Sequence, residues 1–157
     1  VANEFRWAQR RFVTEAKYRK LARYTVKPGD VLITLMGTCG RCAVVPDDIP
    51  VAINTKQLCC ITVDREKCLP EFLHSYFLLH PIARRYLRQT AKGAIMEGLN
   101  MGIIKEMPIP LVPIELQERY RGILENLSRV KTAARRSAAE LDALFASLQH
   151  RAFRGGL

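Results

Sequence analysis

Five cysteines are the residues whose spacing most directly suggests chemistry in this chain. Cys39 and Cys42 form a C-x-x-C pair, a spacing found in zinc sites and in redox-active thiols. A zinc site also needs a second pair of ligands, separated by roughly two to four residues. Cys59 and Cys60 are adjacent instead, so in a strand their side chains point to opposite faces, and Cys68 stands alone. We therefore expect structural thiols that act as small apolar side chains, with no metal and no other cofactor.

Other residue types that catalyse reactions are present, but their spacing does not favour an enzyme. The three histidines are isolated from one another: His74, His80 and His150. Pro46-Asp47 followed by Asn54-Thr-Lys resembles the residue order of metal-dependent nucleases, yet that chemistry requires an acidic ligand where Asn54 stands. The sequence also lacks the two patterns typical of a methyltransferase, a glycine-rich strand–helix junction and an Asn-Pro-Pro-aromatic tetrad. We expect no catalytic residues, and a small nuclease remains a minor alternative.

Three polar loops between apolar segments carry side chains that suit contact with double-stranded DNA. Asn and Gln can form two hydrogen bonds with adenine, Arg can bind guanine or phosphate, and Gly lets the backbone approach a phosphate closely. Arg41 and Lys92 are expected to bind phosphates. The full set of expected DNA contacts is Gly37, Thr38, Gly40, Arg41, Asn54, Lys56, Gln57, Lys92 and Gly93.

The net charge also indicates a polyanionic partner. It is +10 at pH 7, and residues 1–113 hold 17 Lys and Arg against 10 Asp and Glu. Basic domains of this kind often bind nucleic acids, because each phosphate that they neutralise releases condensed counterions. The alternative is a solvated basic surface that only aids solubility.

Short strands and helices are expected to position the three loops. Apolar runs predict strands at 31–36, 41–45, 51–53 and 58–63, and Lys27-Pro-Gly-Asp30 predicts the turn that begins the first strand. The sequence therefore predicts a compact α/β (α+β) domain, a mixed sheet and helix unit that recognises DNA.

The helical segments of this domain have clear boundary signals. Thr14 is placed to cap a short helix that ends near Arg23, and a helical turn is expected at 100–106. Residues 71–89 form a helical pattern that Pro81 kinks or divides. One face of this pattern is expected to hold Phe72, Tyr76, Leu79, Ala83 and Leu87.

The last third of the chain predicts one long coiled-coil helix. From Leu116 to Leu148 an apolar register alternates steps of four and three residues, with Ser137 as its one polar member. A seam this narrow and long needs a second helix alongside it. The expected domains are DNA recognition at 1–113, the helix at 114–152 and a frayed tail at 153–157. Pairing is expected through Tyr120, Ile123, Leu127, Val130, Leu141, Leu144 and Leu148.

No apolar stretch approaches the roughly 20 residues that span a membrane, and the first residues do not resemble a signal peptide. We expect a cytoplasmic protein whose thiols stay reduced.

The order of these motifs resembles the target-recognition domain of type I restriction-modification specificity subunits. The resemblance begins with Tyr24 to Pro46, which contains Lys27-Pro-Gly-Asp-Val-Leu-Ile-Thr34. It continues through Ala52-Ile-Asn-Thr-Lys-Gln57, Pro70-Glu-Phe-Leu-His-Ser-Tyr-Phe-Leu78, Lys92-Gly93 and Ile109-Pro-Leu-Val-Pro-Ile-Glu-Leu-Gln117. In the last motif the family usually has a second proline at Val112 and a glutamate at Leu116. Leu144-Phe-Ala-Ser-Leu148 resembles the helix end of the family.

The resemblance implies a non-catalytic subunit that reads one half of a bipartite DNA site. It also implies docking of methyltransferase and restriction subunits, and pairing of the long helix with a second helix. A homodimer through that helix is one way to complete the pair. The family further implies an additional N-terminal part, so we expect this chain to be part of a recognition domain with its spacer helix. The alternative function is a coiled-coil adaptor that assembles protein partners.

Overall fold

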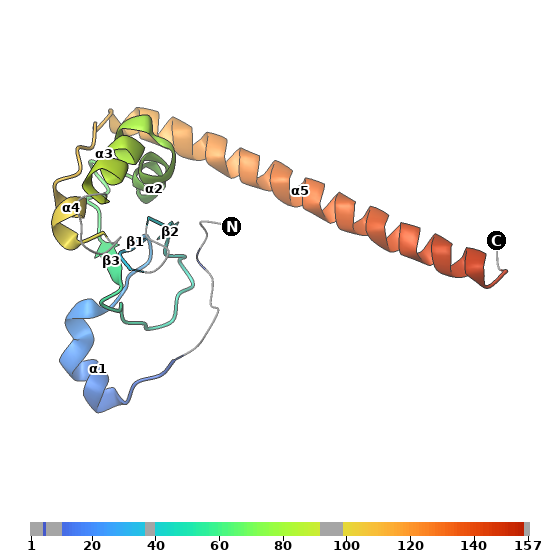
Figure 1. Ribbon diagram of the computed structural model, residues 1–157, viewed down its shortest axis with the longest axis horizontal. Helices are drawn as coiled ribbons and strands as arrows, with labels where there is room; N and C mark the ends of the chain where they lie inside the picture. Colours follow the sequence, from blue (N-terminus) through green and yellow to red (C-terminus); the bar gives the residue numbers. More distant parts are fainter. Residues whose placement is uncertain (1–4, 6–10, 37–39, 92–98, 156–157) are drawn as a thin grey trace. The chain divides into compact units, whose positions relative to one another are not determined.

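The structure is a computed structural model, and it describes residues 5, 11–36, 40–91 and 99–155 (Figure 1). The chain divides into two compact units, Val1–Gln117 and Glu118–Leu157. The first unit contains a small sheet, several short helices and the first turn of a long helix, and the second contains the rest of that helix. The predicted fold class, a mixed α and β unit with one long C-terminal helix, is confirmed.

The sheet of the described residues has three short antiparallel strands. They are β1 (Val31–Thr34), β2 (Cys42–Val44) and β3 (Leu58–Ile61), in the order β2-β1-β3. Ile33 lies opposite both Cys42 and Cys59, and Thr34 lies opposite Leu58. Val31 and Ile33 are fully buried while Leu32 and Thr34 are only partly covered, which is the alternation expected for a strand with one face on the core.

The strand predicted at 51–53 is reduced to a single antiparallel bridge between Thr25 and Ile53. Two backbone hydrogen bonds flank it, from Val26 N to Ala52 O (2.9 Å) and from Asn54 N to Tyr24 O (2.8 Å). The partner segment is short because it lies between a 3-10 helix (η1, Ala22–Tyr24) and Pro28, which has no N–H to donate.

A buried carboxylate holds the predicted turn at 27–30. Asp30 is 2% exposed, and its side chain accepts hydrogen bonds from Lys27 N (2.7 Å), Thr62 Oγ1 (2.7 Å) and Cys60 Sγ (3.2 Å). Gly29 has φ +80°, and a Cβ there would lie 2.0 Å from the Arg65 guanidinium. The turn therefore requires glycine, and Asp30 ties it to β3 and the residues that follow.

The helices of the first unit begin and end where local chemistry predicts. α1 (Glu15–Leu21) is capped by Thr14, whose hydroxyl accepts from Lys17 N (3.4 Å). α4 (Met101–Lys105) is capped by Asn100, whose side chain accepts from Ile103 N (3.0 Å). Both helices confirm the predicted boundaries to within a few residues.

Pro81 divides the predicted helical segment into α2 (Pro70–Leu79) and α3 (Pro81–Ala91). His80 before it is extended (φ −71°, ψ 132°), because proline disfavours the helical conformation of its predecessor. The division changes the buried face of α2. Leu79, expected on the inner face, is 66% exposed, and the buried positions are Pro70, Leu73, Tyr76 and Phe77.

These helices cover one face of the sheet and form a single core. Ile33 of β1 packs in the same cluster as Leu73 and Phe77 of α2, Ala83 of α3 and Ile104 of α4. The Tyr76 hydroxyl donates to Pro108 O, and the Tyr86 hydroxyl donates to Ile103 O (3.0 Å). These contacts determine which face of α3 lies against the core.

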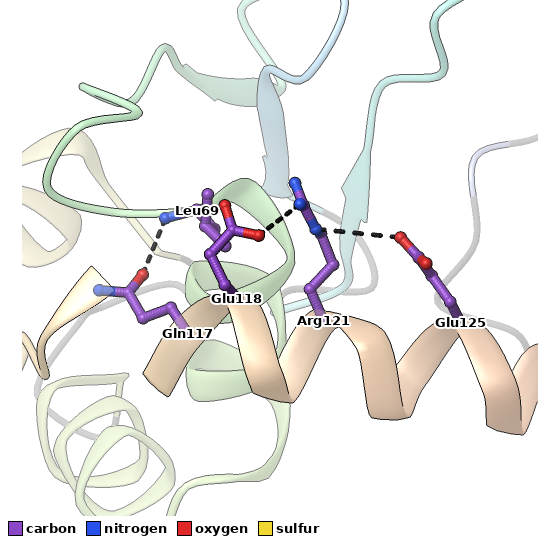
Figure 2. A network of polar contacts seen from close by, with 5 residues as sticks. All are labelled: Leu69, Gln117, Glu118, Arg121 and Glu125. Carbon is purple, nitrogen blue, oxygen red and sulfur yellow. Dashed lines mark hydrogen bonds and ion pairs between the residues drawn. The ribbon is translucent and has the colours of Figure 1, made fainter. Parts of the chain in front are cut away.

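The long helix α5 (Ile114–Phe153) begins at the residue that the three prolines before it predict. In its first turn Gln117 is 1% exposed. The Oε1 atom of Gln117 accepts from Leu69 N (2.8 Å) (Figure 2). Its Nε2 donates to Lys67 O (3.0 Å) and Val112 O (2.8 Å). The first turn of α5 is therefore bonded to the segment that precedes α2.

The second unit is the remainder of α5, whose apolar seam is open to solvent. Exposed fractions along it include 63% for Ile123, 62% for Leu127, 67% for Val130 and 66% for Leu141. Arg121 lies between Glu118 and Glu125 on its surface (Figure 2), with 3.9 Å from Nε to Glu125 Oε1. Within the described residues, no helix is both long enough and apolar enough to cross a membrane.

We predict that Gln117→Ala destabilises the first unit by about 2–3 kcal/mol, because it leaves the buried Leu69 N–H and two carbonyls without partners. The free energy of unfolding from urea titrations of the full chain measures this. Gln149→Ala is the matched control, since Gln149 is exposed on the same helix and its loss should cost less than about 0.5 kcal/mol. Equal effects of the two substitutions would contradict a role for Gln117.

Candidate nucleic-acid interface

Two of the predicted loops meet at one end of the sheet, on either side of β1. The Thr34 N–H donates to Arg41 O (2.9 Å), and the Leu35 N–H donates to Gln57 O (2.9 Å). Arg41 directly precedes β2 and Gln57 directly precedes β3, and both side chains are exposed. The antiparallel register therefore brings Arg41 and Gln57, which are 16 residues apart in the sequence, to the same end of the sheet.

A third segment of the chain reaches the same end of the sheet. The Leu99 N–H donates to Leu35 O (3.1 Å), and Leu99 is buried in the core. Leu35 thus bonds to the second loop and to the segment that follows residue 98. Of the predicted contacts, Gly37, Thr38, Lys92 and Gly93 lie outside the described residues.

The β1–β2 loop closes on Thr34 at its described end. Gly40 has φ +78°, and its N–H donates to Thr34 O (3.1 Å). The Arg41 N–H donates to Thr34 Oγ1 (3.0 Å). Glycine is needed here for its backbone conformation, because a positive φ strains any residue with a Cβ.

The loop at 54–57 has one partly buried residue, Asn54, followed by three exposed ones. Asn54 is partly buried, and its Nδ2 donates to Leu58 O (3.0 Å). Among the described residues its buried Oδ1 has no hydrogen-bond partner. Lys56 and Gln57 are exposed, so their side chains are available to a ligand whereas the Asn54 amide braces the loop.

Three of the described thiols are buried, and the fourth, Cys60, is hydrogen-bonded to Asp30. Cys42, Cys59, Cys60 and Cys68 are free. Burial, with a smaller effect of Cys59, raises the pKa of the Cys42 thiol to about 12. Burial, followed by the hydrogen bond to Asp30, raises the pKa of Cys60 to about 12. In the part of the chain that the structure describes, no three His, Cys, Asp or Glu residues are grouped as metal ligands would be.

Sequence reasoning missed two features of this unit. In the sequence Gln117 looks like an ordinary residue of the long helix. The one signal that distinguishes it is its place as the last residue of the family motif at 109–117. The arginines of α3, Arg84, Arg85 and Arg88, lie on the face of the helix opposite its core residues. Their helical spacing was visible in the sequence, and it becomes informative once the buried face of α3 is known.

The fold is thus a mixed α and β unit, with cationic and amide side chains at one sheet end, followed by a long helix. Residues 8–141 match the family model described as the type I restriction modification DNA specificity domain. The chain therefore belongs to this family.

Two relatives support the assignment. The chain is 30% identical over 139 residues to the type I restriction enzyme EcoBI specificity subunit of Escherichia coli, a match that covers 86% of this chain and 29% of that protein. A chain from a structural study of complex assembly and conformational transition in the type I R-M system matches with a TM-score of 0.57 and 27% identity. That match covers 74% of this chain and 30% of the solved one. This chain spans less than a third of the length of either relative.

We predict that Cys42 makes the fold sensitive to alkaline pH. Because its pKa is about 12 in the folded state and about 9 when unfolded, the stabilising effect of the protonated thiol is complete below pH 9 and is lost as pH rises toward 12. Between pH 8 and pH 10 the free energy of unfolding should fall by about 1.4 kcal/mol more in the wild type than in Cys42→Ala. Val45→Ala is the control, since it truncates another buried side chain that does not titrate. The same pH dependence in all three proteins would show that Cys42 is not the group whose titration destabilises the fold.

Proposed function

We propose that this chain is a DNA-recognition part of a type I specificity subunit and that it reads one half of a bipartite DNA site. The family membership supports a DNA-specificity role. The observation that carries the site is the convergence of Arg41, Gln57 and Leu99 at one end of the sheet through three backbone hydrogen bonds. Loops held on a rigid sheet are suited to presenting base-reading side chains.

The proposed roles follow from the exposure of each side chain. Arg41 and Lys56 bind phosphates, which positions the unit on the duplex without reading bases. Gln57 contacts a base edge, since an amide can accept from and donate to adenine. Asn54 supports this loop from within, because its Nδ2 donates to Leu58 O (3.0 Å) and holds the backbone from which Lys56 and Gln57 project. Thr38, Lys92 and the backbones of Gly37, Gly40 and Gly93 complete the proposed contact set.

The subunit is proposed to be non-catalytic and cytoplasmic. DNA methylation and cleavage then belong to methyltransferase and restriction subunits that dock on it. The metal-dependent nuclease is not favoured, because the described residues lack a cluster of acidic or imidazole ligands at Asn54. Under this assignment residues 1–113 recognise DNA, residues 114–152 form a spacer helix and residues 153–157 are its tail.

α5 is proposed to pair with a second helix through its open seam. The exposed members are Ile123, Leu127, Val130, Leu141, Leu144 and Leu148, with the half-buried Tyr120 at the start. So many exposed apolar side chains in a heptad register indicate a partner helix, either in a second copy or in a larger assembly. A coiled-coil adaptor would use the same seam, but the family assignment favours DNA recognition over that alternative.

We predict that Gln57→Ala lowers the affinity of the full chain, assembled with the methyltransferase subunits of its system, for its preferred duplex by about 10- to 100-fold. Affinity for a scrambled duplex should stay within about twofold, because the lost contact is to a base edge. Selection from random duplexes identifies the preferred sequence, and fluorescence anisotropy measures both affinities.

Gln149→Ala, an exposed glutamine of α5, is the matched control and should bind both duplexes like the wild type. If the wild-type assembly binds all duplexes equally and without dependence on salt, the adaptor alternative is the better description.

We predict that Leu141→Glu raises the dissociation constant of helix pairing by about 100-fold or more, since two apolar side chains are lost from the seam of a symmetric pair. Sedimentation velocity of the full chain measures the monomer–dimer equilibrium. Ala146→Glu is the control, because it adds the same charge on the opposite face of the helix. A wild-type chain that stays monomeric, with its seam protected from solvent, would contradict the pairing.

A further inference from the structure

The exposed face of α3 carries a cationic surface that none of the predicted loops includes. Three arginines occupy it, at positions 84, 85 and 88, and all three are exposed. The opposite face is fixed by packing: Ala83 is fully buried, and Tyr86 donates to Ile103 O of α4. α3 therefore cannot turn its arginines inward without breaking the core.

The charges of this face are not balanced within the described part of the chain. Arg19 of α1, Lys67 and Arg136 of α5 each bind a carboxylate three or four residues away. α3 contains no Asp or Glu at all, and no described carboxylate lies within ion-pair distance of its three arginines. Arg84 and Arg88 instead repel each other at i, i+4, as Arg85 and Arg88 do at i, i+3, which destabilises the helix. A polyanion would relieve this repulsion.

We propose that Arg84, Arg85 and Arg88 form a phosphate-binding surface for the backbone of duplex DNA. The proposal rests on the proposed function and adds a second contact surface to the loops at the sheet end. Arg84 and Arg88 are separated by about 6 Å along the helix axis, one helical turn, so their long side chains can reach separate phosphates of one DNA strand. One guanidinium group can donate two hydrogen bonds to the oxygens of one phosphate, and this contact does not depend on the base sequence. This surface supplies affinity and register, while the sheet-end loops supply specificity.

The test replaces all three arginines by glutamine in the full chain assembled with its methyltransferase subunits. Glutamine keeps helix propensity but removes three phosphate contacts, so the slope of log affinity against log salt should become less steep by about 2.7. The loss of affinity between 50 and 200 mM salt should then be about 40-fold smaller than in the wild type. The ratio of affinities for preferred and scrambled duplexes should stay within about twofold.

Two further variants separate charge from structure. Arg84→Lys/Arg85→Lys/Arg88→Lys keeps the cations and should retain most of the wild-type slope. Arg129→Gln/Lys131→Gln/Arg135→Gln removes the same charge from exposed positions of α5 and should leave the slope unchanged. The glutamine variant should also unfold at or above the wild-type temperature, because like charges on one helix are removed. If the triple glutamine variant does not fold, the single variants Arg84→Gln and Arg88→Gln replace it. Each should make the slope of log affinity against log salt less steep by about 0.9.

The outcomes distinguish this surface from the proposed function. A wild-type slope in the folded glutamine variant overturns the α3 proposal, while selective binding by the wild type keeps the DNA-recognition function. Loss of methyltransferase assembly with an unchanged slope overturns it too, because it assigns the face to a protein partner. Absence of any salt-dependent duplex binding by the wild type refutes both proposals.

Discussion

The buried carboxylate of Asp30 is the interaction on which the first unit depends. It joins the backbone of the turn before β1 to Cys60 of the neighbouring strand β3 and to Thr62 just after that strand, which opposes sliding of β1 past β3. A shift of one residue would move Val31 and Ile33 from the core to the other face of the sheet. Because Thr34 then stays opposite Leu58, the loops before β2 and β3 end on either side of β1 at the same end of the sheet. The candidate DNA surface is a consequence of this register.

The proposed binding surfaces differ in how the fold supports them. The sheet-end loops are fixed by backbone hydrogen bonds to Thr34 and Leu35, which leaves the Arg41, Lys56 and Gln57 side chains outward. The α3 face is fixed by side-chain packing on the opposite side of the helix. The first arrangement fixes the backbone from which the Gln57 amide projects, which suits base recognition. The second presents flexible cations, which is sufficient for phosphates.

Gln117 has a different task, at the start of α5. Its amide satisfies the buried backbone donor of Leu69 and two partly buried backbone acceptors. A short polar side chain thus replaces the backbone hydrogen bonds that irregular, proline-containing segments cannot make. This explains why a glutamine follows the Pro113-Ile-Glu-Leu segment at a fully buried position, where its side chain would otherwise be costly.

Local chemistry was enough to predict several elements from the residues alone. Thr14 caps α1, Pro81 separates α2 from α3, and the prolines before Ile114 define the start of α5. Each of these signals acts within a few residues, through hydrogen bonds or steric exclusion that any chain of the same local sequence would share. The heptad register of α5 was equally visible, because helical periodicity is a property of one segment.

Contacts between distant segments could be decided only by the packed chain. Asn54 turns its amide toward Leu58, Asp30 meets Thr62 across 32 residues, and Leu79 is left outside when α2 ends before Pro81. The arginines of α3 form one outward face only because Ala83 and Tyr86 are held by the core. Side-chain burial and register depend on which elements meet. That is a property of tertiary packing, which no short stretch of residues contains.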